Sequence, residues 1–297
     1  MSFQVDTALV QAYKSGIEIQ FQQKGSRLRE TVDVESQNAE YEYYDRIGST
    51  EAVEVTNRHG DTPLISTPHT RRRISTSDWD WADMVDKKDK IRMISDPTSP
   101  YQRNAVFALG RRLDRVIIAA ATGTAYTGKT GSTAVVFPTA TPRIAVDYVE
   151  SGAAANSNLT IGKLRRARYL FDSNEAVEDG EQLHCIVSAS QLQALLRSTE
   201  VTSADYNTVR ALVKGEINEF MGFNFKRTEL LTKSGDNRSV LCYPKSGIKV
   251  GIADEVNVDV GPRRDKRNSI QVYVCGSFGG VRMWEEKVVE VLCDETV

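Results

Sequence analysis

The chain has 297 residues, of which 40% are hydrophobic, so it is long enough to bury one large core or two smaller ones. Its 38 basic and 40 acidic residues give a formal net charge of −2, which argues against a protein that binds mainly by neutralising phosphates. The longest apolar run, Val116 to Ala121, is far shorter than the roughly 20 residues that cross a bilayer, so we expect no membrane contact.

Residues 1–40 are predicted to form an extended arm. The start of the chain lacks the basic and apolar segments of a secretory signal, so we expect a soluble protein made in a cytoplasm. The segment is mostly polar, with short β-like pieces and little to form a core. It therefore gains order only by lying on another surface, and we expect identical neighbouring copies to supply that surface.

Residues 41–90 are predicted to form an extended hairpin loop. From 41 to 86, polar and β-branched residues alternate, and the tripeptides that begin at His59 and Ser66 supply turn signals. The segment has few large apolar side chains for its length, so it cannot form a compact domain by itself. We expect such a hairpin to find its contacts on another chain.

Two amphipathic helices follow. The first is predicted over residues 98–123, with Ser99 as N-cap, Pro100 at the first helical position and Gly123 at the end. Its apolar stripe consists of Ala105, Leu109, Leu113, Val116, Ile117 and Ala120. The second helix begins after Thr160 as N-cap, and its apolar face consists of Ile161, Leu164, Ala167 and Phe171.

The second half of the chain predicts mainly strands. A strand at Leu183–Ser188 leads into the helix SQLQALLRS, and residues 201–225 predict a helix, a glycine stop at Gly215 and an aromatic strand with a kink at Gly222. The later strands are SVLCYP, GIKVGIA, VNVDVG, SIQVYVCGSFGGVRM and KVVEVLC. The expected class is α+β, with one long helix and mostly antiparallel sheet.

The cysteines and histidines do not form a metal-binding pattern. The four cysteines are far apart and lie in apolar, strand-like contexts, which predicts reduced, buried thiols at Cys185, Cys242, Cys275 and Cys293. The three histidines are scattered as well. We therefore expect no metal and no cofactor.

One stretch fits a phosphate-binding loop. Gly123 to Thr130 match G-x-x-x-x-G-K-[ST], in which backbone N–H groups and Lys129 would hold phosphates. The motif requires a strand before it and a helix after it, whereas here a helical pattern precedes it and Gly131, Pro138 and β-branched residues follow. We favour a plain loop, and a nucleotide-binding enzyme using Gly123–Thr130 is the alternative of a different class.

The densest basic cluster lies in the hairpin at Arg71, Arg72 and Arg73. It is compatible with a solvated strand, with guanidinium groups that pair with carboxylates of an adjacent subunit, or with nucleic-acid contact. Acidic residues follow closely, at Asp78 and Asp80 among others, and can pair with the arginines of a neighbouring copy. These five residues are our candidates for inter-subunit contact.

The order of these parts resembles the major capsid protein of tailed bacteriophages, whose fold is named after phage Hong Kong 97. The segments GSRLR (Gly25–Arg29), DPTSPY (Asp96–Tyr101) and residues 200–225 are similar to a podophage-like branch of that family. The resemblance implies an arm at 1–40, an extended loop at 41–90, a peripheral domain at 91–175 with a spine helix at 98–123, an axial domain at 176–265, and return strands of the peripheral domain at 266–297.

The resemblance also implies the function. The chain is expected to be a structural protein and no enzyme, self-assembling as hexamers and pentamers into an icosahedral head around a double-stranded DNA genome. It would be part of the virion, assembled in the host cytoplasm with portal and scaffolding proteins as partners. An encapsulin-like protein compartment of the same fold is the alternative. Some members cross-link through a lysine of the extended loop, but no lysine lies between Tyr41 and Asp86.

Overall fold

The computed structural model describes residues 22–58, 60–86, 98–197 and 219–296. Within them, three sheets are combined with the helices α2 (Thr98–Thr122), α3 (Ile161–Ser173) and α4 (Ala189–Arg197), and with short 3-10 turns at Arg29–Thr31, Lys245–Gly247 and Arg264–Lys266. This mixture confirms the α+β class. The predictions for residues 1–21 and for the helix and glycine stop within 201–218 lie outside the described residues.

The long helix α2 confirms the sequence prediction to within one residue at its end. Gly123 closes it by donating its backbone N–H to the carbonyl of Ala119 at 2.8 Å. The helix starts at Thr98, so Ser99 lies inside the first turn rather than at the N-cap. The predicted apolar stripe faces the interior: Ala105, Leu109, Leu113 and Ile117 are buried, and Val116 and Ala120 are half-buried.

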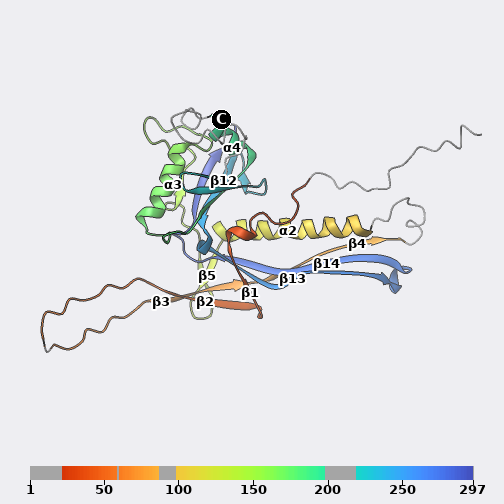
Figure 1. The fold of residues 1–297 in the computed structure, drawn as a ribbon, viewed down its shortest axis with the longest axis horizontal. Coiled ribbons are helices and arrows are strands. Elements are labelled where there is room, and N and C mark those ends of the chain that lie inside the picture. Colours follow the sequence, from red (N-terminus) through yellow and green to blue (C-terminus); the bar gives the residue numbers. More distant parts are fainter. Residues whose placement is uncertain (1–21, 59, 87–97, 198–218, 297) are drawn as a thin grey trace, which may run out of the picture.

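The first sheet has the order β1-β13-β14-β4, and α2 lies along it (Figure 1). Its strands are β1 (Asp33–Ser36), β4 (Ser77–Val85), β13 (Ile248–Arg263) and β14 (Ser269–Arg282). β1 runs parallel to β13, and the other neighbours are antiparallel. The strands predicted as GIKVGIA and VNVDVG are one strand, β13, with two shifts of its register against β14 between Ile252 and Asn257.

The hairpin is shorter than predicted. β2 (Tyr41–Ile47) and β3 (His69–Ser75) pair with each other, but the next strand, β4, leaves the hairpin and pairs with β14. The reason is aromatic packing: Trp79 and Trp81 of β4 pack against a cluster that contains Leu109 of α2 and Val274 of β14. The predicted hairpin of residues 41–86 is therefore wrong beyond Ser75, because β4 carries apolar groups that the local pattern assigned to an uncovered loop.

The arm is also partly misjudged, because its described residues lie on their own subunit. The buried carboxylate of Asp114 on α2 accepts hydrogen bonds from the side chains of Gln23 and Ser26, and from the backbone N–H groups of Arg27 at 3.0 Å and Leu28 at 3.2 Å. Charge-assisted hydrogen bonds are roughly twice as strong as neutral ones. One acidic side chain of the helix thus fastens the arm segment.

Close backbone contact and apolar burial complete this attachment. A Cβ atom on Gly110 of α2 would lie 2.6 Å from the carbonyl carbon of Gly25, so only glycine lets the arm cross the helix here. Further along, Leu28 and Val32 are buried in the cluster that contains Ile117 of α2. The arm prediction failed for these residues because the partners that hold them lie far away in the sequence.

The second sheet has the order β7-β15-β12-β8-β10-β9, with β11 (Lys233–Ser234) beside β12. Its strands are β7 (Arg143–Ile144), β8 (Leu183–Val187), β9 (Glu219–Phe220), β10 (Phe223–Arg227), β12 (Asn237–Pro244) and β15 (Val289–Asp294). The pairs β8–β10 and β7–β15 are parallel. The predicted kink at Gly222 is a tight turn between β9 and β10, with a φ of 78°.

The helix α3 packs into the core of this second sheet as its pattern predicts. Thr160 is the N-cap and accepts a hydrogen bond from the backbone N–H of Lys163, and Ile161, Leu164, Ala167 and Phe171 are all buried. The four cysteines are free thiols. Burial is confirmed for Cys185, Cys242 and Cys293, whereas Cys275 on β14 is half-buried.

The sheets cross one predicted domain boundary. Residues 265 and 266 separate β13 from β14, although these strands pair along most of their length, from Ile248–Arg282 to Arg263–Ser269. β15, assigned by the resemblance to the peripheral return, pairs with β12 of the second sheet. The five-part division of the chain stays a prediction.

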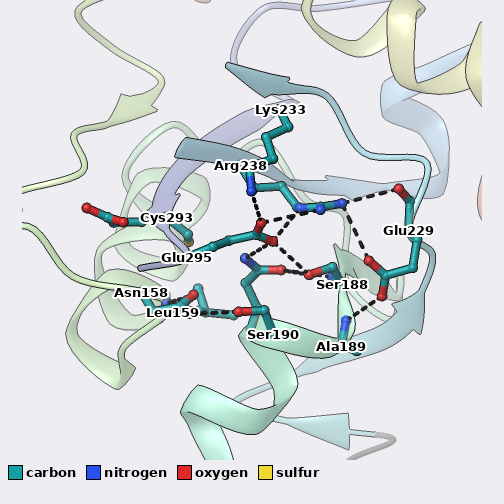
Figure 2. A network of polar contacts seen from close by, with 12 residues as sticks. Asn158, Leu159, Ser188, Ala189, Ser190, Glu229, Lys233, Arg238, Cys293 and Glu295 are labelled. Carbon is teal, nitrogen blue, oxygen red and sulfur yellow. Dashed lines mark hydrogen bonds and ion pairs between the residues drawn. The ribbon is translucent and has the colours of Figure 1, made fainter. Parts of the chain in front are cut away.

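A polar network joins the end of the chain to the second sheet (Figure 2). Glu295 forms ion pairs with Arg238 of β12 at 2.5 Å and with Lys233 at 2.7 Å, and it accepts a hydrogen bond from Ser188 at 3.3 Å. Burial by itself would raise the pKa of Glu295, but the hydrogen bonds from Lys233, Arg238 and Gln191 outweigh it and lower the pKa to about 2. The network therefore requires an ionised Glu295.

We predict that the subunit loses stability as the pH falls from about 4.5 to about 2. A carboxyl whose pKa is lower in the folded state stabilises the fold above its unfolded pKa of 4.5, and this contribution is lost on protonation. At neutral pH, Glu295→Gln should lower the free energy of unfolding by on the order of 2 kcal/mol, and the difference should vanish near the lower end of this range. Denaturant unfolding over a pH series measures the free energy of unfolding of the wild type and of Glu295→Gln.

The exposed Glu150, which pairs with Arg165 at 3.0 Å, provides the matched control. Glu150→Gln should change the free energy of unfolding by less than about 1 kcal/mol. A difference between wild type and Glu295→Gln that does not change with pH would contradict the prediction.

Candidate subunit-contact surfaces

The third sheet, at the root of the hairpin, has two unlike faces. Its order is β2-β3-β5-β6, with β5 at Ala125–Thr127 and β6 at Thr133–Val135. Successive side chains of a strand point to opposite faces, so Arg71 and Arg73 lie on one face and Arg72 on the other. The inner face is buried and the outer face is half-exposed. Arg72 therefore lies in the interior, and Arg71 and Arg73 lie at the surface.

The outer face carries interleaved tyrosines and arginines. The guanidinium of Arg73 lies between two rings, 4.8 Å from the centroid of Tyr41 and 4.7 Å from that of Tyr126. Arg71 lies 5.8 Å from the ring centroid of Tyr43. Cation–π contact holds each guanidinium over its ring and leaves its N–H edges available to further acceptors. We call Tyr41, Tyr43, Arg71, Arg73 and Tyr126 the tyrosine–arginine face.

A pocket of about 350 Å³ adjoins this face, lined by Asp45, His69, Thr70, Arg71, Gly128 and Lys129. Arg71 forms an ion pair with Asp45 at 2.7 Å. Among the described residues, Lys129 has no ion pair, and no other carboxylate lines the pocket. The pocket therefore has an excess of positive charge and is suited to an acidic group from outside the subunit.

The phosphate-loop alternative is wrong for this structure. Gly123 ends α2, the residues after it form β5, and Gly128 and Gly131 make a turn with φ values of 92° and 61° before β6. No helix follows the glycines, so the aligned N–H groups that a phosphate loop needs are missing at this place. Lys129 instead lines the basic pocket beside Arg71.

Arg72 points inward, which is contrary to its prediction as an inter-subunit contact. Its side chain is only 1% exposed; it pairs with Glu285 and donates from Nε to the carbonyl of Met283 at 3.3 Å. Arg282, fully buried, contacts the same carboxylate at 3.3 Å. Burial lowers the pKa of Arg282, and Glu285 opposes this shift. Arg72 thus fastens the hairpin to its own subunit, because alternation along β3 turns it towards the core.

Asp78 and Asp80 lie elsewhere, on β4 of the first sheet. They are two residues apart and exposed; Asp80 accepts a hydrogen bond from the hydroxyl of Tyr273 at 2.9 Å, and Asp78 accepts one from Ser277. The bond to Asp80 raises the pKa of Tyr273 to about 12. Among the described residues, neither carboxylate has an ion pair with an arginine or lysine. Within one subunit, the structure does not bring these acids together with Arg71 and Arg73.

Over the described ranges, no helix is long and apolar enough to cross a membrane. In the same part of the chain, no three side chains of His, Cys, Asp or Glu are grouped closely enough to hold a metal ion.

Comparison with known proteins decides the family. The family profile described as "Phage capsid protein" matches residues 5–295. The chain belongs to the phage capsid protein family. It is a structural major capsid protein of a phage head and therefore a component of the virion. Its copies associate into capsomers. Neither the nucleotide-binding enzyme nor the encapsulin-like compartment is favoured as an alternative. Assignment to a podophage-like branch stays a prediction.

Solved capsid structures share its fold. The capsid of cyanophage P-SCSP1u has a TM-score of 0.73 at 15% identity, and the match covers 97% of this chain and 94% of that one. For the Helicobacter pylori bacteriophage KHP30, the TM-score is 0.73 at 8% identity, with coverage of 99% and 98%. For Mycobacterium phage Che8, the TM-score is 0.70 at 13% identity, and the match covers 97% of both chains. A search of the curated proteins found no match.

Sequence reasoning found the basic cluster of the capsid protein but missed its aromatic partners. Tyr41 and Tyr43 alternate with Glu42 and Tyr44, a signal that puts both on the same face of a strand. Tyr126 gave no such signal, because it joins the face only through the pairing of β3 with β5. Glu285, the partner of Arg72, lies more than 200 residues away and was not recognisable from the sequence.

We predict that Arg72→Ala lowers the free energy of unfolding of the isolated subunit by roughly 3 kcal/mol, because it breaks a buried pair. Arg71→Ala is the matched control: its pair with Asp45 is exposed, so it should cost less than about 1 kcal/mol. Urea unfolding of the two variants measures this difference. Equal losses would show that Arg72 is no anchor.

Proposed function

We propose that this capsid protein closes into hexameric and pentameric rings, which form an icosahedral head around double-stranded DNA. Assembly would take place in the host cytoplasm with scaffolding and portal proteins, and the inner face would contact the DNA. Within this proposal, α2 is the spine helix, residues 176–265 form the axial domain, and residues 91–175 and 266–297 form the peripheral domain. The family shows the capsid role, and the features below support the manner of assembly.

The observation that carries the proposal is the uncovered hairpin loop. Between the paired strands β2 and β3, every described residue from 49 to 66 is exposed, and the loop extends away from the rest of the subunit (Figure 1). It presents large apolar side chains to solvent, with Val55 79% and Leu64 98% exposed. Contiguous exposed apolar groups mark interaction sites. A neighbouring copy is the surface that a capsid protein has in abundance.

Charge complementarity supports a second contact. Arg71, Arg73 and Lys129 form a basic surface at the hairpin root, and Asp78 and Asp80 form an acidic row on β4. The two surfaces belong to different sheets of the same chain. A contact between different patches of identical copies is heterologous, and it closes into a ring when the rotation fits. We propose that the acidic row of one copy meets the tyrosine–arginine face and Lys129 of the next.

Removing the loop tests the assembly role. Replacing residues 50–66 with a short Gly-Ser linker should leave a folded subunit, because those residues make no part of the core, and should abolish shell formation. Circular dichroism and thermal unfolding show whether the subunit is folded. Negative-stain microscopy and size-exclusion chromatography show whether shells have formed. Intact particles from the shortened chain would refute the role given to the loop.

Charge reversal tests the second contact. Arg71→Glu with Arg73→Glu, or Asp78→Arg with Asp80→Arg, should each lower shell yield by about tenfold or more, since like charges then face each other. Subunit stability should change much less than for Arg72→Ala, because Arg71 and Arg73 are half-exposed and Asp78 and Asp80 are exposed. The chain with all four substitutions should regain shells, as measured by sedimentation.

Arg168→Glu on α3 serves as the control, because Arg168 is half-exposed and its only ion pair among the described residues is with Asp172 on the same helix. It should assemble like wild type. A fourfold variant that assembles no better than either double variant would rule out the proposed pairing.

A further inference from the structure

We propose that Leu64 of one copy inserts into an apolar pocket between the arm, α2 and β13 of a second copy. The inference rests on the proposed assembly through the hairpin loop and adds the place where the loop is seated. The occupant is a second copy of this chain.

The pocket has the size and lining of a seat for an apolar side chain. Its volume is about 240 Å³, below the range of about 300–1,000 Å³ that is usual for small-molecule sites, so it suits one or two side chains. Its apolar lining comes from α2 and the first sheet: Val106, Leu109, Leu113, Ile252, Val256 and Phe278. Gly25 and Ser26 of the arm form the opposite wall.

The walls of this pocket are held in place before any partner binds. The arm wall is fixed by the hydrogen bonds of Ser26 and its neighbours to Asp114, and by the close crossing of Gly25 over Gly110. The sheet wall lies where β13 shifts its register against β14, between Ile252 and Asn257. Such irregularities bend a strand and are common at functional edges. Because the pocket is preformed, little conformational entropy is lost in its walls when a side chain binds there.

Leu64 has the properties of the inserted group. It is 98% exposed, the most exposed of the large hydrophobic side chains in the described residues, and Ile65 beside it is 48% exposed. Pro63 restricts the backbone just before it, so less freedom is lost when the segment docks. The loop leads away from α2 and from the β13–β14 ribbon of its own subunit (Figure 1), so its own pocket is out of reach.

Charge around the pocket matches the loop. Asp254 and Glu255 both line the pocket. Arg29 forms an ion pair with Glu255 at 2.8 Å and none with Asp254. Within the described part of the chain, Asp254 has no ion pair, and neither has Arg58 of the loop. The surplus negative charge at the pocket is therefore complementary to Arg58, six residues before Leu64. An exposed apolar group and a matching pocket on different parts of one chain make a head-to-tail contact, as ring closure requires.

A cysteine pair tests the seat directly. Leu64→Cys combined with Val256→Cys should form a disulfide between copies when assembled shells are oxidised, because a disulfide needs Cα atoms within about 7 Å. The matched control pairs Leu64→Cys with Val260→Cys, on the same strand, 37% exposed and outside the pocket lining. Non-reducing electrophoresis should show linked chains for the first pair and monomers for the control and the single variants.

Shells that form without this link, or that link equally well through Val260→Cys, would overturn the inference and leave the assembly role of the loop intact. Absence of shells from the wild-type chain in the presence of its scaffolding protein would instead refute the proposed assembly. As a second measurement, Leu64→Asp should abolish shells, whereas Thr56→Asp, at an exposed polar position of the same loop, should still form them. Shells from Leu64→Asp, or equal loss in both variants, would also overturn the seat.

Discussion

The attachment of the arm to α2 is the constraint on which much of the capsid protein depends. Asp114 places a carboxylate in the interior, and a buried charge is tolerated only when hydrogen-bond donors surround it. The side chains and backbone of residues 23–28 supply those donors. The arm thereby contributes Leu28 and Val32 to the core. Its residues Gly25 and Ser26 also form one wall of the pocket beside α2.

The hairpin root shows how one strand divides its residues between the interior of the subunit and its outer surface. Alternation along β3 sends Arg72 and Ile74 inward and leaves Arg71 and Arg73 outside. The inward arginine shares Glu285 with Arg282 and fixes the angle at which the hairpin leaves the subunit. The outward arginines rest on tyrosine rings, which hold their guanidinium groups in place on the outer face. A firm base and an uncovered loop together are the features on which the proposed contact with another copy rests.

Local patterns predicted those elements whose partners are close in sequence. The stripe of α2, the Thr160 cap of α3 and the buried strand β8 follow from spacing alone, because a helix or strand shows its buried face in its own periodicity. The same reasoning misjudged β4 and the described arm, because polar segments with few apolar groups look uncovered until a distant element covers them. Of the three arginines in the predicted contact cluster, the structure buries Arg72 and leaves Arg71 and Arg73 on the outer face, where inter-subunit contact stays a prediction.

By itself, the amino-acid sequence determined the α+β class, the order of arm, hairpin and long helix, and the likeness to phage capsid proteins. The class follows from composition and periodicity, and the likeness is a resemblance in the order of parts and in a few short segments. Only the tertiary structure decided which arginine is buried, that Lys129 lies beside Arg71, and that a pocket opens between the arm, α2 and β13. Such decisions depend on pairs like Arg72 and Glu285, whose contact arises from the packing of three sheets and leaves no local pattern in the chain.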